Sequence, residues 1–124
     1  MHFNEYQTKA GEFAQYPELF IKVNEDDAPP SSFEPVPYLY SALGLAGETG
    51  EVVEKIKKII RNQQGEIMES DRDLIQRELG DVLWYLADLA DLFLLSLDDI
   101  AQTNLEKLED RAKRGVIASE GDTR

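Results

Sequence analysis

Apolar residues recur at intervals of three and four along most of this chain, which is the spacing of one face of an α-helix. The pattern predicts four helices, over about residues 4–15, 38–63, 70–95 and 96–115. No segment shows the strict alternation of apolar and polar residues that is typical of a half-buried strand. We therefore expect an all-α protein of the four-helix bundle type.

Several polar residues and one glycine predict where these helices begin and end. Ser70 followed by Asp73, and Ser96 followed by Asp99, are each typical of an N-cap with an acidic residue in the first turn. Gly115 follows the last periodic residues and is a suitable C-terminal stop. We expect one domain over residues 1–117 and a frayed tail over residues 118–124.

The stretch from residue 23 to residue 37 is rich in proline, aspartate, asparagine and serine. This composition favours neither a regular helix nor a central strand. Loops of this length in compact domains are usually either functional or disordered. The segment is thus both a candidate lid and a candidate simple connector.

Three glycines interrupt the second predicted helix at three-residue spacing: Gly44, Gly47 and Gly50. Each costs about 1 kcal/mol relative to alanine inside a helix. Close approach of another helix backbone would compensate this cost. The alternative is that the helix begins later, near Ala46.

The third predicted helix carries apolar residues on more than one face, which suggests burial against several helices and a partner subunit. Trp84 in this helix is most simply interpreted as a core or interface residue. We expect a homodimer or homotetramer, with the functional cleft completed by a neighbouring chain.

The charge of the chain restricts its partners. A formal net charge of −12 argues against a nucleic acid polymer, because binding a phosphate backbone requires a surplus of lysine and arginine. A mononucleotide needs only a local group of cations and a bound metal ion. The chain has no cysteine, and His2 is its single histidine, so thiolate chemistry and histidine-dependent mechanisms have no support. A polar N-terminus and the lack of long apolar runs predict a cytoplasmic protein without membrane contact.

Two pairs of carboxylates give the clearest chemical signal: Glu48 with Glu51, and Glu78 with Asp81. Residues at i and i+3 lie on one face of a helix, so two such helices packed together would direct four carboxylates into one cleft. Acidic pairs are common on solvated helices, but Glu78 and Asp81 lie in the most apolar helix, where unpaired charges are costly. The arrangement suits Mg²⁺, with Mn²⁺ as a substitute ion.

Further polar residues continue these helical faces. Lys55 and Lys58 follow the first acidic pair, Tyr85 and Asp88 follow the second, and the last helix carries a stripe of its own: Asn104, Lys107, Arg111 and Arg114. Amide and cationic groups complement an anionic substrate next to a metal ion. Surface ion pairs explain the cations equally well, and for Asp88 a solvated or salt-bridged position is favoured.

Three motifs carry a resemblance to a known family: LGLAGETGEV at residues 43–52, ELGDVLWYL at residues 78–86, and NLEKL at residues 104–108 with the arginines that follow. In this order and at these separations they resemble a MazG-like nucleotide pyrophosphohydrolase, over most of the chain. The resemblance implies an all-α fold and Mg²⁺-dependent cleavage of nucleoside triphosphates to monophosphates and pyrophosphate.

The resemblance also implies roles for individual residues. The metal ligands would be Glu48, Glu51, Glu78 and Asp81, and the substrate contacts would be Lys55, Lys58, Tyr85, Asn104, Lys107 and Arg111. Many members have two adjacent glutamates where this chain has Gly47 and Glu48, so the identity of the general base stays open between Glu48 and Glu51. A non-catalytic helical module that binds nucleotide or a protein partner is the alternative function.

Overall fold

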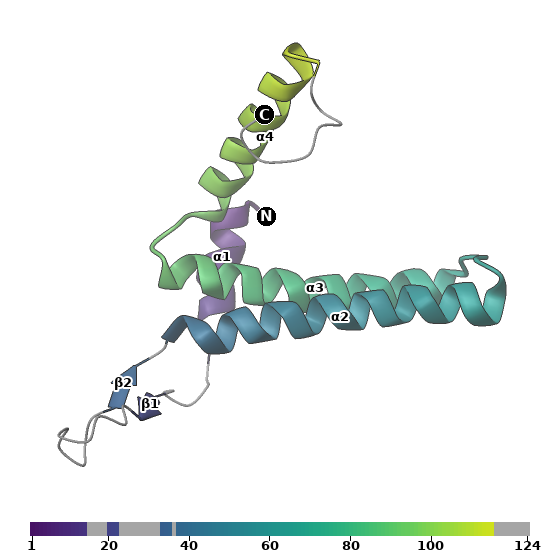
Figure 1. Ribbon diagram of the computed structural model, residues 1–124, viewed down its shortest axis with the longest axis horizontal. Coiled ribbons are helices and arrows are strands. Elements are labelled where there is room, and N and C mark those ends of the chain that lie inside the picture. The colour runs from purple at the N-terminus through teal and green to yellow at the C-terminus, as the bar shows by residue number, and fades with distance from the viewer. Residues whose placement is uncertain (15–19, 23–32, 36, 116–124) are drawn as a thin grey trace.

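The computed structural model describes residues 1–14, 20–22, 33–35 and 37–115 (Figure 1). It confirms the all-α prediction. The helices are α1 (Phe3–Gly11), α2 (Pro37–Gln63), α3 (Glu69–Leu92) and α4 (Leu97–Lys113). The tail expected over residues 118–124 lies outside the described residues.

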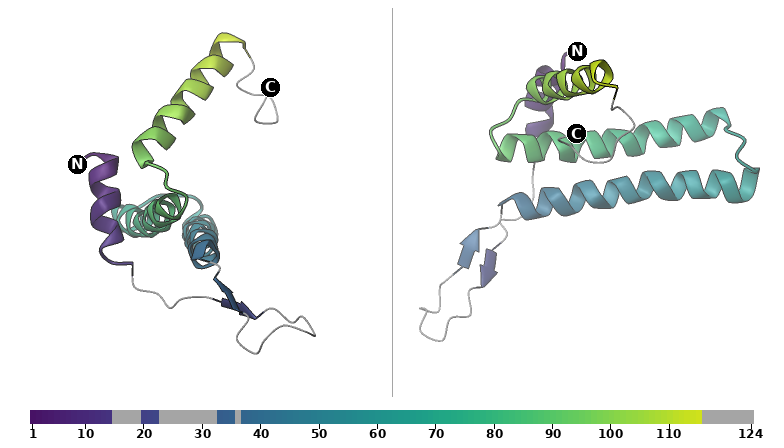
Figure 2. Two further views of the ribbon diagram at one scale, coloured as in Figure 1. Left: turned by 90° about the vertical axis from the view of Figure 1, so that its left-hand side faces the viewer. Right: turned by 45° about the horizontal axis from the view of Figure 1, so that its top comes forward.

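Helices α2 and α3 form a long antiparallel hairpin and lie side by side in every view (Figures 1 and 2). Gln64 and Gly65 both have positive φ angles, which ends α2 and reverses the chain. The Asp71 side chain accepts hydrogen bonds from the Met68 backbone N–H at 2.9 Å and from Gln63 at 2.7 Å. Helix α3 therefore starts at Glu69, and the prediction that Ser70 is its N-cap was wrong.

Helix α1 packs across α3 and also contacts the start of α4. The Trp84 indole donates a 3.2 Å hydrogen bond to the carbonyl of Ala10, which joins α3 to α1. The buried Gln7 amide donates to the Leu95 carbonyl at 2.8 Å and accepts from the Leu97 N–H at 2.8 Å. One side chain of α1 thus sets the corner between α3 and α4.

The predicted ends of α4 are confirmed. The Ser96 hydroxyl accepts the Asp99 backbone N–H at 3.2 Å and caps the helix. The chain leaves the other end of α4 through Gly115, whose φ is 71°.

Two short strands, β1 (Phe20–Lys22) and β2 (Phe33–Pro35), pair antiparallel with Phe20 opposite Pro35. Because β2 falls within the segment expected to be a loop, the prediction of residues 23–37 as loop was wrong for residues 33–35. Proline is tolerated here because each strand of a two-stranded sheet has an unpaired edge that needs no N–H donor.

Helix α2 begins at Pro37 and continues through all three glycines, so the alternative start near Ala46 was also wrong. The apolar core within the described residues is small. Ala87, Ala90 and Leu97 form its centre, where α3 meets α4.

Helix α4 projects away from the α2–α3 hairpin, and α1 is the helix it packs against most (Figures 1 and 2). Within the described ranges of one chain, the four helices thus do not all pack on one another. None of the helices in the described ranges is both long and apolar enough to cross a lipid bilayer.

Candidate metal centre

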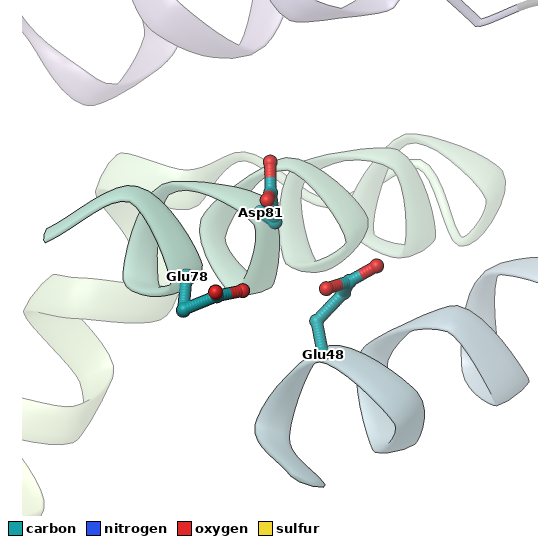
Figure 3. Close-up of side chains that lie close together, drawn as sticks. All are labelled: Glu48, Glu78 and Asp81. Atoms are coloured by element: carbon teal, nitrogen blue, oxygen red, sulfur yellow. The ribbon is translucent and has the colours of Figure 1, made fainter. Parts of the chain in front are cut away.

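Three of the four predicted carboxylates converge between α2 and α3. One oxygen each of Glu48, Glu78 and Asp81 lies within 4.8 Å of the others. Figure 3 shows the Glu48 side chain reaching from α2 towards the two carboxylates of α3. Oxygens around one Mg²⁺ ion lie about 3–4.2 Å apart, so small side-chain movements would bring these three into one coordination sphere.

The electrostatics of this group fit a cation. The pKa of Glu48 is raised, first by burial and then by repulsion from Asp81, Glu78 and Glu51. A divalent ion would favour the ionised form of Glu48 and relieve this repulsion. All the donors are carboxylate oxygens, as hard cations such as Mg²⁺ prefer. The residues present therefore fit the metal that the sequence predicts.

Lys55 provides a cation at the edge of the group. Its ammonium lies 3.3 Å from a carboxylate oxygen of Glu78, in a contact that joins α2 to α3. The sequence left Lys55 open between a phosphate contact and a surface ion pair. The structure pairs it across the hairpin with a predicted metal ligand.

Tyr85 lies one helical turn beyond Asp81 and packs against the notch left by Gly44. A Cβ atom on Gly44 would come within 2.1 Å of the Tyr85 ring, so this glycine is required for close packing. The compensation for Gly44 is therefore contact with a side chain rather than with a helix backbone. Gly47 and Gly50 have no such neighbour within 4 Å.

The polar side chains between α2 and α3, among them Glu48, Lys55, Glu78 and Asp81, form a polar seam. The Tyr85 hydroxyl belongs to this seam. Its pKa is raised, first by burial, then by a hydrogen bond with Tyr40, and further by the charges of Glu48 and Asp88. The ring of Trp84 meets the Tyr85 ring edge-on at 4.8 Å between centroids. Tyr85 thus keeps its proton and lies within the electrostatic influence of Glu48.

Other predicted site residues are not brought into the group of three carboxylates within one chain. Glu51 is exposed and acts on Glu48 only as a neighbouring charge. Lys58 pairs with Glu54 of its own helix at 3.3 Å. The stripe on α4 lies on the helix that projects away from the hairpin: Asn104, Lys107 and Arg111.

Sequence reasoning missed one contact of the seam. Asp88 was expected to be solvated or salt-bridged; its burial contradicts the solvated alternative, and its carboxylate accepts a hydrogen bond from the Ser41 hydroxyl. A signal was present, because Asp88 continues the helical face of Glu78, Asp81 and Tyr85. The direction of that face toward α2 was what the sequence left open.

Comparison with known proteins identifies the family. The family model of the MazG nucleotide pyrophosphohydrolase domain matches residues 39–116. The chain belongs to the MazG family. The matched range covers nearly all of α2 and the whole of α3 and α4, and so includes the three carboxylates, which confirms the resemblance seen in the sequence.

The whole chain also resembles a phage protein. It is 42% identical over 124 residues to the Gene 37 protein of Mycobacterium phage L5, with both chains covered completely. No solved structure matches the chain.

The notch at Gly44 leads to a stability prediction with a built-in control. Gly44→Ala should lower the free energy of unfolding by about 1–3 kcal/mol, because the new methyl group displaces the Tyr85 ring. Gly47→Ala has free space and should raise it by up to about 1 kcal/mol through helix propensity. Urea denaturation of both variants measures this difference, and equal effects at the two positions would contradict the packing of Tyr85 on Gly44.

The raised pKa of Glu48 predicts that its contribution to folding stability changes with pH in opposite directions in the presence and absence of metal. In the metal-free protein the folded state binds the Glu48 proton more tightly than the unfolded chain does. As pH falls from neutral towards the ordinary carboxyl value of 4.5, the contribution of Glu48 to folding stability should therefore rise. With saturating Mg²⁺, which requires the ionised carboxylate, the contribution of Glu48 to folding stability should fall over the same pH range.

The comparison of wild type with Glu48→Gln isolates this titration, since the variant cannot ionise at this position. Denaturation over the same pH range, with and without Mg²⁺, gives the required differences. The raised pKa would be contradicted if, in the metal-free protein, the free energies of unfolding of wild type and Glu48→Gln differed by the same amount at every pH.

Proposed function

We propose that this MazG domain is a Mg²⁺-dependent pyrophosphohydrolase that converts (deoxy)nucleoside triphosphates to monophosphates and pyrophosphate. The observation that carries the proposal is the convergence of Glu48, Glu78 and Asp81 between two helices of a MazG domain. Three converging carboxylates suit a divalent ion that also contacts substrate phosphates.

Glu48, Glu78 and Asp81 would hold the ion, which can be Mg²⁺ or Mn²⁺. When bound, it would supply a positive charge that stabilises the phosphates and lowers the pKa of a coordinated water. In the reaction the water oxygen forms a bond to the α-phosphorus, and the bond from that phosphorus to the bridging oxygen of pyrophosphate breaks. Glu51, which lies outside the group of three and influences Glu48 through its charge, would accept the proton of the water, with Glu48 as the other candidate.

The remaining seam residues would act on the phosphates. Lys55 already lies at the edge of the carboxylate group and would neutralise charge that develops on the leaving oxygens. Tyr85 is held in its protonated form and would donate a hydrogen bond. Lys58, on the same helix as Lys55, would reach the outer phosphates after leaving Glu54.

Substitution of the ligands tests this function. Glu48→Gln and Asp81→Asn should each reduce Mg²⁺-dependent pyrophosphate release by at least about 100-fold, with the helical circular dichroism unchanged. Glu51→Gln should also reduce turnover, because Glu51 is the proposed acceptor of the water proton. Glu54→Gln is the matched control, because Glu54 lies on the same helix but pairs with Lys58.

Release is measured over a panel of nucleoside triphosphates at saturating Mg²⁺. Near-normal turnover by Glu48→Gln or Asp81→Asn would remove those residues from the site. Inertness of the wild type over the whole panel would favour the alternative, a non-catalytic module that binds nucleotide or protein.

We also propose that the domain works as a homodimer or homotetramer. Among the described residues, large apolar side chains remain exposed on both long helices, including Leu43, Val53, Ile60 and Leu79. Near the turn of the hairpin an apolar hollow of about 630 Å³ is lined by residues such as Ile56, Ile67 and Ile75. Exposed apolar surface of this extent supports association with further copies.

Association would also complete the site. Helix α4, which includes Asn104, Lys107 and Arg111, projects away from the α2–α3 hairpin of its own chain (Figure 1). Placed beside the hairpin of a second copy, α4 would bring these groups to the phosphates bound there. We propose that each site takes its carboxylates from one chain and its α4 cations from another.

Mixing of two inactive variants tests this arrangement. Asp81→Asn removes the carboxylate side of the site, and Lys107→Ala with Arg111→Ala removes the cationic side. If each site is shared, subunit exchange between the two variants should restore up to about one quarter of wild-type activity per site, by random assortment in a dimer. Exchange proven by mass-tagged subunits without any recovery of activity would contradict a shared site.

A further inference from the structure

Ser41 of α2 and Asp88 of α3 form a side-chain hydrogen bond across the hairpin in which both residues are buried. The Ser41 side chain is 0% exposed and that of Asp88 is 7% exposed. The Ser41 hydroxyl donates a hydrogen bond to a carboxylate oxygen of Asp88. Neither residue has a role in the reaction proposed above.

This contact lies on the same two helical faces as the carboxylate group. On α2, Ser41 is followed by Gly44 and Glu48 at i+3 and i+7; on α3, Asp88 is preceded by Tyr85 at i−3 and Asp81 at i−7. Because the helices are antiparallel, Ser41 faces Asp88, Gly44 faces Tyr85, and Glu48 faces Asp81. The Tyr85 ring therefore separates the buried hydrogen bond from the carboxylates.

The carboxylate group needs such a contact for a physical reason. Repulsion between Glu48 and the two α3 carboxylates favours separation or sliding of the helices. Apolar contacts resist separation but are non-directional, so they hold the register weakly. A hydrogen bond between two short side chains is directional and strong in a buried setting, and a slide of one residue, about 1.5 Å, would break it.

We propose that Ser41 and Asp88 are positioning residues that hold α2 and α3 in the register required for metal binding. Through Tyr85 in its notch at Gly44, their hydrogen bond sets where Glu48 lies relative to Glu78 and Asp81. This inference deepens the proposed function, since it rests on the three carboxylates being the metal site.

Metal affinity tests the proposal independently of catalysis. Mn²⁺ binding to the full chain without nucleotide is measured by calorimetry, at a temperature where every variant is folded. Ser41→Ala and Asp88→Ala should each weaken Mn²⁺ binding by about tenfold or more, as expected for residues that orient metal ligands. Asp88→Asn should stay within about threefold of wild type, because its amide oxygen can still accept the Ser41 hydroxyl.

Gln7→Ala is the matched control for general loss of stability. Gln7 is also buried and hydrogen-bonded between helices, but at the corner between α3 and α4. It should destabilise the fold and leave Mn²⁺ affinity within about threefold of wild type. The fluorescence of Trp84, which contacts Tyr85, should shift in Ser41→Ala and stay unchanged in Asp88→Asn.

The outcomes separate this inference from the proposed function. If wild type binds Mn²⁺ but hydrolyses no nucleotide, and the variants lose affinity as stated, the positioning role stands and the catalytic proposal fails. Wild-type affinity in Ser41→Ala and Asp88→Ala, equal losses in Asp88→Asn and Asp88→Ala, or an equal loss in Gln7→Ala would each overturn the positioning role. A wild-type chain that binds no Mn²⁺ would overturn both.

Discussion

The register in which α2 packs against α3 is the constraint on which the rest of this structure depends. It brings Glu48 opposite Glu78 and Asp81, places the Tyr85 ring against Gly44, and pairs Lys55 with Glu78. At the group of three carboxylates, electrostatic repulsion opposes the packing of α2 on α3. Burial and this repulsion together raise the pKa of Glu48. Directional contacts on both sides of that group hold the helices together: Lys55 with Glu78 at one side and Ser41 with Asp88 at the other.

The polar contacts between α2 and α3 matter both for the packing of the two helices and for the proposed metal site. A hairpin joined only by apolar contacts would be stable in several registers, whereas a metal site tolerates errors of only a fraction of an ångström. Repulsion among the carboxylates opposes the packing of α2 on α3 in the metal-free chain, whereas the Lys55–Glu78 and Ser41–Asp88 contacts favour one register. Binding of a cation would convert the repulsion at Glu48 into attraction, so metal binding and folding should reinforce each other.

The sequence predicted those features that are governed by short-range patterns. Apolar spacing predicted all four helices, and the i, i+3 spacing of Glu78 and Asp81 correctly placed both carboxylates on one face. The cap at Ser96 and the stop at Gly115 were also predicted, because both depend on neighbouring residues. The start of α3 was misplaced by competition between nearby polar groups, since Asp71 rather than Ser70 satisfies the helix end.

Features governed by distant contacts could not be read from the sequence. Asp88 is buried and bonded to Ser41, which is 47 residues away, and its carboxylate resembled a surface charge when that partner was not known. The direction of α4 depends on the corner at Leu94, where φ is 57°, and on Gln7 more than 80 residues earlier. The cationic stripe of α4 was therefore correctly placed on a helix, while the projection of that helix away from the α2–α3 hairpin became visible only in three dimensions.

Diffraction from crystals grown with Mn²⁺, recorded at the manganese absorption edge, tests the central claim most directly. We expect an anomalous peak between α2 and α3, about 2.1 Å from oxygens of Glu48, Glu78 and Asp81. A peak elsewhere on the chain, or none at saturating Mn²⁺ with these three carboxylates directed into solvent, would contradict that claim.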